Sequence, residues 1–381
     1  MSKKKELAKN TIIILVGKFC TQFLSFFLLP LYTAYLSSKE YGTVDLITTY
    51  VSLIVPIITL QVEMGIFREL IDSRNNENYT KKIISSGIFT IFIQFLLCLI
   101  IYIVINLLIN IPFSLYIVFN VFAIMLSNVL LQIARGFGDN LSYSIGSTIA
   151  GVATILFNIF FIVILKWNIE GMLLSTALAN LITALFMFFK LKLYKYLSRL
   201  CINKKIIKKI INYSLPLVPN GLIWWVINVS DRTIITIFLG AAANGIYAIS
   251  NKFSSVLIQI YNVFNLSWTE SASLHINDKD RDSFFSDTFN TILKLFSSIC
   301  LMLIALLPII FNWLINKNYN ESYMYVPILL LGMIFNIIVS FIGCIYVAKK
   351  LTKQVAMTSF WSGIINILIN LILIKPIGIY A

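Results

Sequence analysis

Charged residues are scarce in this sequence. They make up 12% of the 381 residues, whereas an ordinary soluble domain carries about 25%. Because hydrophobic residues make up 59%, the chain lacks the polar side chains that would cover its surface in water. We therefore expect an integral membrane protein that spans the bilayer along nearly its whole length. A nucleic-acid-binding protein is excluded, despite the net charge of +14.

Residues and motifs typical of catalysis are also scarce. The chain has a single histidine, His275, and its five cysteines form no Cys-x-x-Cys unit. The sequence has no phosphate-binding glycine-rich motif. No Ser/His/Asp set or carboxylate pair falls in one apolar segment. We therefore expect no enzyme activity, no metal site and no resident cofactor.

Long hydrophobic segments, in contrast, fill the chain. A helix needs about 20 apolar residues to cross a bilayer, and eleven segments reach this length. They lie at 11–36, 43–66, 83–110, 113–134, 143–165, 171–190, 213–239, 245–268, 286–315, 325–348 and 355–374. The sequence thus predicts an all-α polytopic membrane protein with eleven transmembrane helices.

Basic residues are distributed unequally between the two sides of these segments. Of the 30 Lys and Arg residues, 22 fall in the N-terminus and the even-numbered loops, and four in the odd-numbered loops. Since cytoplasmic loops carry the excess of positive charge, we expect a cytoplasmic N-terminus in the cell (inner or plasma) membrane. The loops on the other side are short and leave no room for a catalytic domain.

Two hairpin turns indicate an internal repeat. Leu36–Gly42 and Leu239–Gly245 each read Leu, five residues, Gly, at an offset of 203 residues. This offset predicts two parallel six-helix bundles, at 1–190 and 213–381, joined by a cytoplasmic linker at 191–212. Two such bundles need twelve helices, so we expect the C-terminal bundle to be truncated before a twelfth. A natural eleven-helix topology is the alternative.

The linker has an amphipathic pattern. Ile202, Ile206 and Ile210 recur at a spacing of four, with lysines between them. This pattern is typical of a helix that lies in the membrane interface with its lysines toward anionic headgroups. A simple tether that also sets the topology is the alternative.

Charged side chains inside apolar segments are candidate functional residues, because a charge in the bilayer is costly. Arg232 lies seven residues before Leu239, and Lys252 lies seven residues after Gly245. Both therefore fall about 10 Å below the same turn, while Lys18 is expected nearer the cytoplasm. The sequence predicts that Lys18, Arg232 and Lys252 form a cationic, substrate-binding cavity. Polar pairing between helices is the alternative.

Three acidic residues in or beside apolar segments are also candidate functional residues: Asp45, Glu63 and Asp231. Asp45 and Glu63 lie nearer helix ends, where capping or extension toward the interface also accounts for a charge. Asp231 either partly neutralises Arg232 or reaches a different helix, since adjacent residues on a helix do not face each other.

Several short stretches share the pattern of one known family. Leu29-Pro-Leu-Tyr-Thr-Ala-Tyr-Leu36 precedes the first hairpin turn, and Ala134-Arg-Gly-Phe-Gly138 follows the fourth segment. Ser214-Leu-Pro-Leu-Val-Pro219 and Ser230-Asp-Arg-Thr-Ile234 lie in the seventh segment. As a set they resemble Wzx-type polysaccharide-biosynthesis (O-antigen) flippases of the multidrug/oligosaccharidyl-lipid/polysaccharide (MOP) exporter superfamily. The resemblance runs through the chain from about residue 7.

This resemblance implies two MATE/MOP-type bundles that work by alternating access. It implies a substrate, an oligosaccharide on undecaprenyl diphosphate, that is flipped to the outer leaflet for O-antigen or capsule synthesis. Lys18, Arg232 and Lys252 would then contact the diphosphate or acidic sugars. In this superfamily transport can be coupled to a proton or sodium gradient, and the resemblance makes Asp45, Glu63 and Asp231 the candidate ion-coupling sites. Membrane lipids are expected partners, together with a polysaccharide polymerase and glycosyltransferases.

Two other functions are alternatives to this one. A multidrug or small-molecule exporter of the same superfamily is the main alternative, although we expect such an exporter to place carboxylates in its cavity. A membrane polymerase or ligase is disfavoured because these enzymes typically act in a sizeable outer loop.

Overall fold

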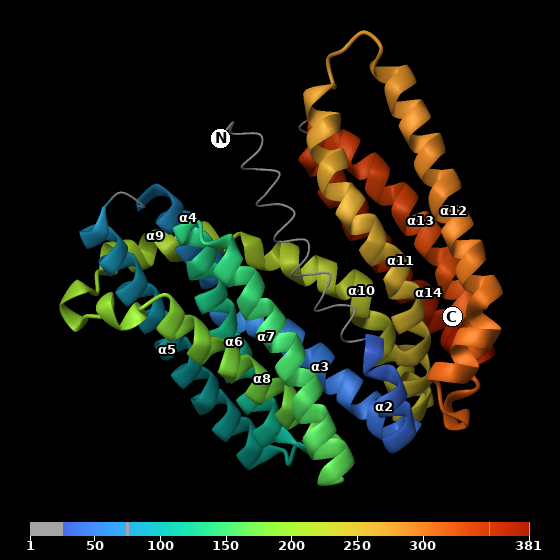
Figure 1. The fold of residues 1–381 in the computed structure, drawn as a ribbon, viewed down its shortest axis with the longest axis horizontal. Helices are drawn as coiled ribbons and strands as arrows, with labels where there is room; N and C mark the ends of the chain where they lie inside the picture. Colours follow the sequence, from blue (N-terminus) through green and yellow to red (C-terminus); the bar gives the residue numbers. More distant parts are fainter. Residues whose placement is uncertain (1–25, 74–75, 350, 381) are drawn as a thin grey trace. The chain divides into compact units, whose positions relative to one another are not determined.

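The computed structural model describes residues 26–73, 76–349 and 351–380, which form helices and connecting turns without a strand (Figure 1). Contacts group these residues into two compact units. Unit 1 comprises residues 26–28 and 47–224, and unit 2 comprises residues 29–46 and 225–380. The helices α3 (Ser38–Thr59) and α10 (Leu217–Leu239) each contribute one end to either unit. The bundle boundaries expected from the sequence stay a prediction.

Unit 1 is an all-helical body. Besides parts of α3 and α10, it contains α4 (Val62–Ser73), α5 (Glu77–Leu108), α6 (Ser114–Phe137), α7 (Asn140–Asn158) with the π-helical η1 (Ile159–Ile164), α8 (Ile169–Lys190), the short 3₁₀ helices η2 (Leu193–Lys195) and η3 (Arg199–Cys201), and α9 (Lys204–Ser214). The helices α6, α7 and α8 pack side by side, and α4 packs on α6. Its core is aliphatic, with Ile66, Leu70 and Ile133 fully buried.

Local signals explain where several of these helices begin and end. The side chain of Asn76 accepts a hydrogen bond from the Tyr79 backbone N–H and caps α5, and Asp139 caps α7 by accepting from Ser142. Between them, α6 ends at Gly138, whose φ of +82° is the left-handed conformation that glycine adopts without strain.

Unit 2 is also all-helical. Besides the remaining parts of α3 and α10, it contains α2 (Leu29–Tyr35), α11 (Ala241–Leu274), α12 (Arg281–Leu314), η4 (Lys317–Tyr319), α13 (Ser322–Ala348), α14 (Thr352–Ile377) and η5 (Gly378–Tyr380). The long helices α11 and α13 pack against each other. Near one end of this pair, Trp268 stacks on Phe341 with ring centroids 4.3 Å apart and donates a hydrogen bond to its carbonyl at 3.2 Å.

The polytopic all-α class expected from the sequence is confirmed. Eight of the described helical segments are long and apolar enough to cross a membrane, and the exact number of eleven stays a prediction. One expected segment, 43–66, differs in the structure. It is broken at Leu60 and Gln61, and the chain continues as the separate helix α4.

The linker helix α9 packs on unit 1 through its apolar face. Ile206 and Ile210 are buried in the core of unit 1, where α9 packs on α4 and α5. The Lys209 ammonium pairs with the buried Glu69 carboxylate of α4 at 2.7 Å. The apolar face of α9 therefore contacts protein, while Lys204, Lys205 and Lys208 are exposed. That this helix lies in the membrane interface stays a prediction. The amphipathic pattern of a helix does not reveal whether lipid or protein will cover its apolar face.

Candidate polar site in unit 2

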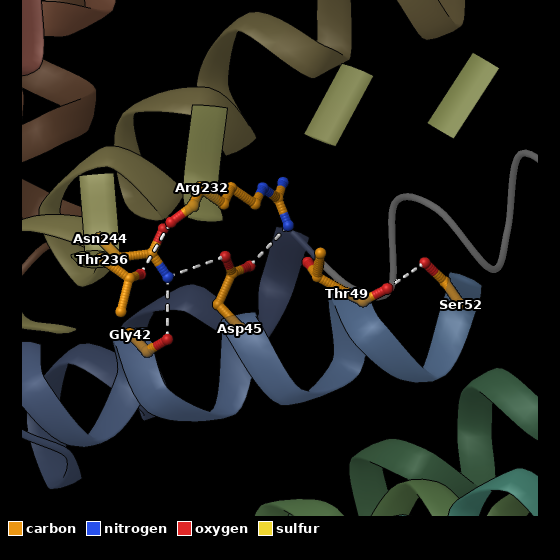
Figure 2. A network of polar contacts seen from close by, with 7 residues as sticks. All are labelled: Gly42, Asp45, Thr49, Ser52, Arg232, Thr236 and Asn244. Carbon is orange, nitrogen blue, oxygen red and sulfur yellow. Dashed lines mark hydrogen bonds and ion pairs between the residues drawn. The ribbon is translucent and has the colours of Figure 1, made fainter. Parts of the chain in front are cut away.

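The two repeated hairpin turns position the main polar cluster. Gly42 near the start of α3 and Gly245 near the start of α11 lie so close that a β-carbon on either would overlap the backbone of the other helix. The side chain of Asn244 bridges the same crossing by donating a hydrogen bond to the Gly42 carbonyl at 2.8 Å (Figure 2). The glycine that ends each turn thus permits a close helix crossing.

An ion pair lies next to this crossing. Arg232 of α10 donates from Nη1 to Asp45 Oδ1 of α3 at 2.9 Å (Figure 2). The Asp45 side chain is 8% exposed and the Arg232 side chain 21%. Asp45 is therefore buried against an oppositely charged partner, and extension toward the interface does not account for it. The second oxygen of Asp45 lies 3.5 Å from the Asn244 amide nitrogen.

Lys252 follows Asn244 in the same helix, α11. It is half-buried and close enough to Asp45 and Arg232 to interact electrostatically with both. Among the described residues, no carboxylate oxygen lies within 4.0 Å of its ammonium group. The structure thus places Arg232 and Lys252 within electrostatic reach of each other, and their role in binding a substrate stays a prediction. The structure also pairs Arg232 with Asp45, which is one of the three predicted ion-coupling residues.

Asp231 belongs to a different group of contacts, on the side of α10 that faces α11 and α14. Its Oδ1 accepts a hydrogen bond from Asn370 at 2.6 Å, and its Oδ2 accepts one from the Tyr247 hydroxyl at 3.1 Å. Asp231 therefore reaches other helices, one of the two outcomes that the sequence left open. Asn366 completes the group by accepting from Ser230 at 3.3 Å.

A cavity of about 190 Å³ opens beside Asp231. Aliphatic residues and the tyrosines Tyr247, Tyr325 and Tyr380 line it, together with Asn366 and Asn370. One carboxylate, two amides and three phenols converge on one small, largely apolar space. This combination can bind a cation or a group that donates hydrogen bonds.

The remaining predicted site residues lie elsewhere. Lys18 falls outside the described residues. Glu63 lies in α4 of unit 1, is 8% exposed and belongs to neither group in unit 2. With all groups ionised, the charges of Asp45, Asp231, Arg232 and Lys252 sum to zero. Because Arg232 is paired with Asp45 and Asp231 lies in a different group of contacts, a local positive charge remains at Lys252.

Sequence reasoning missed the amides that organise both groups. Asn366 and Asn370 are four residues apart and so share one helix face, and this spacing was the available signal. Asn244 directly precedes Gly245 in the repeated turn. Its amide oxygen is fully buried and accepts no hydrogen bond from the described residues.

Solved structures show which fold these helices form. The chain is similar to the inward-facing conformation of a multidrug resistance MATE family transporter of the MOP superfamily, with a TM-score of 0.73 and 12% identity over 95% of this chain and 88% of that chain. It is also similar to a MOP superfamily transporter from Pyrococcus furiosus, described as having a binding pocket of reverse polarity. That match has a TM-score of 0.63 and 12% identity over 99% and 89% of the two chains. At this identity the matches establish a MATE/MOP-type fold.

The sequence itself carries a family match. The family model described as polysaccharide biosynthesis protein matches residues 7–268. No protein with a curated description matches the sequence. The family model covers more than half of the chain. The chain therefore belongs to the polysaccharide biosynthesis protein family.

Proposed function

We propose that this protein flips an undecaprenyl-diphosphate-linked oligosaccharide from the cytoplasmic to the outer leaflet of the cell membrane. The family match supports a role in polysaccharide synthesis, and Lys252 is the observation that carries the choice of cargo. It is a half-buried ammonium group without a close carboxylate among the described residues. An anionic diphosphate or acidic sugar would supply the missing counter-charge.

The physical need for such a group is clear. Moving a diphosphate and sugars through hydrocarbon without compensation costs far more than thermal energy supplies. A helix bundle with an internal cation and many amides lowers this cost, while the prenyl chain stays in lipid. Alternating access between two bundles would carry the head group across. On this proposal the N-terminus is cytoplasmic, and a polymerase and glycosyltransferases act after and before the flippase.

The test uses a strain that lacks the gene. Carrier-linked oligosaccharide should accumulate in the cytoplasmic leaflet, and the wild-type gene should restore its transfer. Lys252→Ala should fail to restore transfer, while Lys252→Arg should restore it at least in part. Lys294→Ala is the matched control, because Lys294 is an exposed lysine of the spanning helix α12, and it should behave as wild type. Equal membrane abundance of all variants has to be verified.

A second candidate function is export of a small organic cation. The solved multidrug transporters and the carboxylate in the tyrosine-lined cavity at Asp231 favour it. If the deletion strain accumulates no carrier-linked oligosaccharide but becomes sensitive to cationic drugs, this candidate replaces the first. Asp231→Asn, and not Lys252→Ala, should then abolish resistance.

A further inference from the structure

The cavity beside Asp231 in unit 2 has a buried floor and an exposed rim. Tyr247, Asn370 and Ile374 line it and are buried. Ile328 and Tyr380 also line it, and both are exposed. The cavity therefore enters the unit from its surface and ends at buried polar groups, which is the arrangement of a small-molecule site.

The polar groups of the floor are held in place by hydrogen bonds. Asp231 accepts one hydrogen bond on each oxygen, from Asn370 and from the Tyr247 hydroxyl. The Asn370 amide nitrogen also lies 3.5 Å from the Asn366 amide oxygen. A carboxylate has about four acceptor positions, and an amide both donates and accepts. The floor therefore presents donors and acceptors in fixed positions, which lowers the entropy cost of binding a polar ligand.

The rest of the lining is apolar and aromatic. Half of the residues that line the cavity are isoleucine or leucine. Tyr325 of α13 and Tyr380 of η5 bring two rings together, with their centroids 4.8 Å apart. A tyrosine ring offers an apolar face beside a polar hydroxyl. A ligand that matches this lining has an apolar face together with polar groups at its edge.

The size of the cavity restricts the ligand further. An apolar cavity of about 150 Å³ holds one benzene molecule, whereas this cavity has about 190 Å³. It therefore has room for one six-membered ring with a few hydroxyl groups, and it is too small for two linked rings.

The mixture of donors and acceptors favours a sugar over a cation or an anion. A hydroxyl group both donates and accepts hydrogen bonds, so a sugar ring uses the carboxylate and the amides together. A small cation would use the acceptors and leave the amide donors unused. A phosphate or an acidic sugar would be repelled by the Asp231 carboxylate.

We propose that the cavity at Asp231 binds one uncharged pyranose ring. Asp231 and Asn370 hold neighbouring hydroxyl groups of the ring, and the rings of Tyr325 and Tyr380 pack against its C–H face. The binding of a sugar rests on the cavity alone. That this sugar is part of a lipid-linked cargo rests on the proposed function, and it then requires a cargo with at least one uncharged sugar.

Saturation-transfer difference NMR on the purified full chain in lipid nanodiscs tests this site without a transport assay. The probes are the methyl glycosides of glucose, galactose, mannose, N-acetylglucosamine and N-acetylgalactosamine, with methyl glucuronide as the acidic comparison. At least one neutral glycoside should receive saturation at its ring protons, and methyl glucuronide should receive none.

Three variants connect the signal to the cavity. Asp231→Asn should lower the affinity for the bound glycoside about tenfold, the effect of losing one hydrogen bond to a charged group. Tyr380→Ala should lower it as well. Because Tyr380 is exposed, this change leaves the core of unit 2 intact, and Tyr380→Phe should retain binding because it keeps the ring. Thermal unfolding midpoints verify that the variants are folded.

The matched control and the outcomes are equally specific. Asn336→Ala should bind as wild type, because Asn336 is an exposed amide of α13 outside the cavity lining. Absence of any neutral-glycoside signal that depends on Tyr380 and Asp231 would overturn the proposal. Saturation of tetraethylammonium instead of the glycosides, lost in Asp231→Asn, would assign the cavity to the second candidate function.

Failure of this site and failure of the proposed function are distinguishable. Glycoside binding by a protein that flips no carrier-linked oligosaccharide in the gene-deletion test would overturn the proposed function and leave the sugar site intact. Flipping by a protein that binds none of the neutral glycosides would overturn the sugar site and leave the proposed function intact.

Discussion

Gly42 of α3 and Gly245 of α11 are in backbone contact, and they are the final residues of the two repeated turns. Two segments 203 residues apart in the sequence thus become direct neighbours within unit 2. The contact brings Asp45, which follows the first turn, within reach of Arg232, which precedes the second turn.

Replacing either glycine of this contact by alanine should destabilise the protein. The added β-carbon of Gly42→Ala would overlap the Ala241 carbonyl oxygen, and overpacking of this kind typically costs about 1–3 kcal/mol. Thermal unfolding in detergent should therefore shift to lower temperature. Gly332→Ala is the control, because nothing lies within 4 Å of its β-carbon position. As a replacement of an exposed helical glycine, it should leave the midpoint unchanged or raise it. Equal midpoints for all three variants would contradict the close contact.

The ion pair between Asp45 and Arg232 should behave as a buried pair. Removing one partner leaves an uncompensated charge, which costs about 3–5 kcal/mol in buried settings. Asp45→Asn and Arg232→Gln should each lower the unfolding midpoint strongly, whereas the double variant should cost less than the sum of the two. The pair Arg68–Asp72 is the comparison, because its side chains are 44% and 53% exposed and such pairs contribute about 0–1 kcal/mol. A coupling energy near zero for Asp45 and Arg232 would rule out the buried pair.

The docked position of α9 predicts a pattern of chemical accessibility. In a cysteine-free background, a cysteine at Ile210 should resist a water-soluble maleimide, because Ile210 is 1% exposed. A cysteine at the exposed Lys208 should react quickly. Rapid reaction at both positions would show that α9 is detached from α4. Because Glu69 raises the pKa of Lys209 through their hydrogen bond, the lysine side of this pair stays charged at pH 9, below the ordinary lysine pKa. Its charge is lost only as the pH rises through the raised value, so protection at Ile210 should persist at pH 9.

The helical plan could be read from the sequence because hydrophobic length is a local property. The segments 83–110 and 325–348 coincide closely with α5 and α13. The depth argument that placed Arg232 and Lys252 near one another also relied only on helix rise and on the repeated turn. Both inferences required no knowledge of which helices pack together.

The partners of the charged groups could not be read in this way. Whether Arg232 faces Asp231 or Asp45 depends on the crossing of α3 and α11, which is set by two glycines far apart in the sequence. The break after Thr59 was missed for a similar reason. Neither Leu60 nor Gln61 is a residue that favours left-handed backbone, and the hydrogen bond from Gln61 to Leu217 comes from a distant helix.

The hydrogen bond between Asn370 and Asp231 predicts a measurable loss of stability when it is removed. Asn370 is 7% exposed and donates to Asp231 Oδ1 at 2.6 Å. In Asn370→Ala the carboxylate loses this donor, and hydrogen bonds to charged groups contribute about 1.5–3 kcal/mol. The unfolding midpoint should therefore fall. It should recover in part in the double variant Asp231→Asn/Asn370→Ala, because the remaining buried group is then neutral. Thr358→Ala, at an exposed position of the same helix, should leave the midpoint near that of the wild type. A double variant no more stable than Asn370→Ala would show that the charge of Asp231 is compensated by other groups.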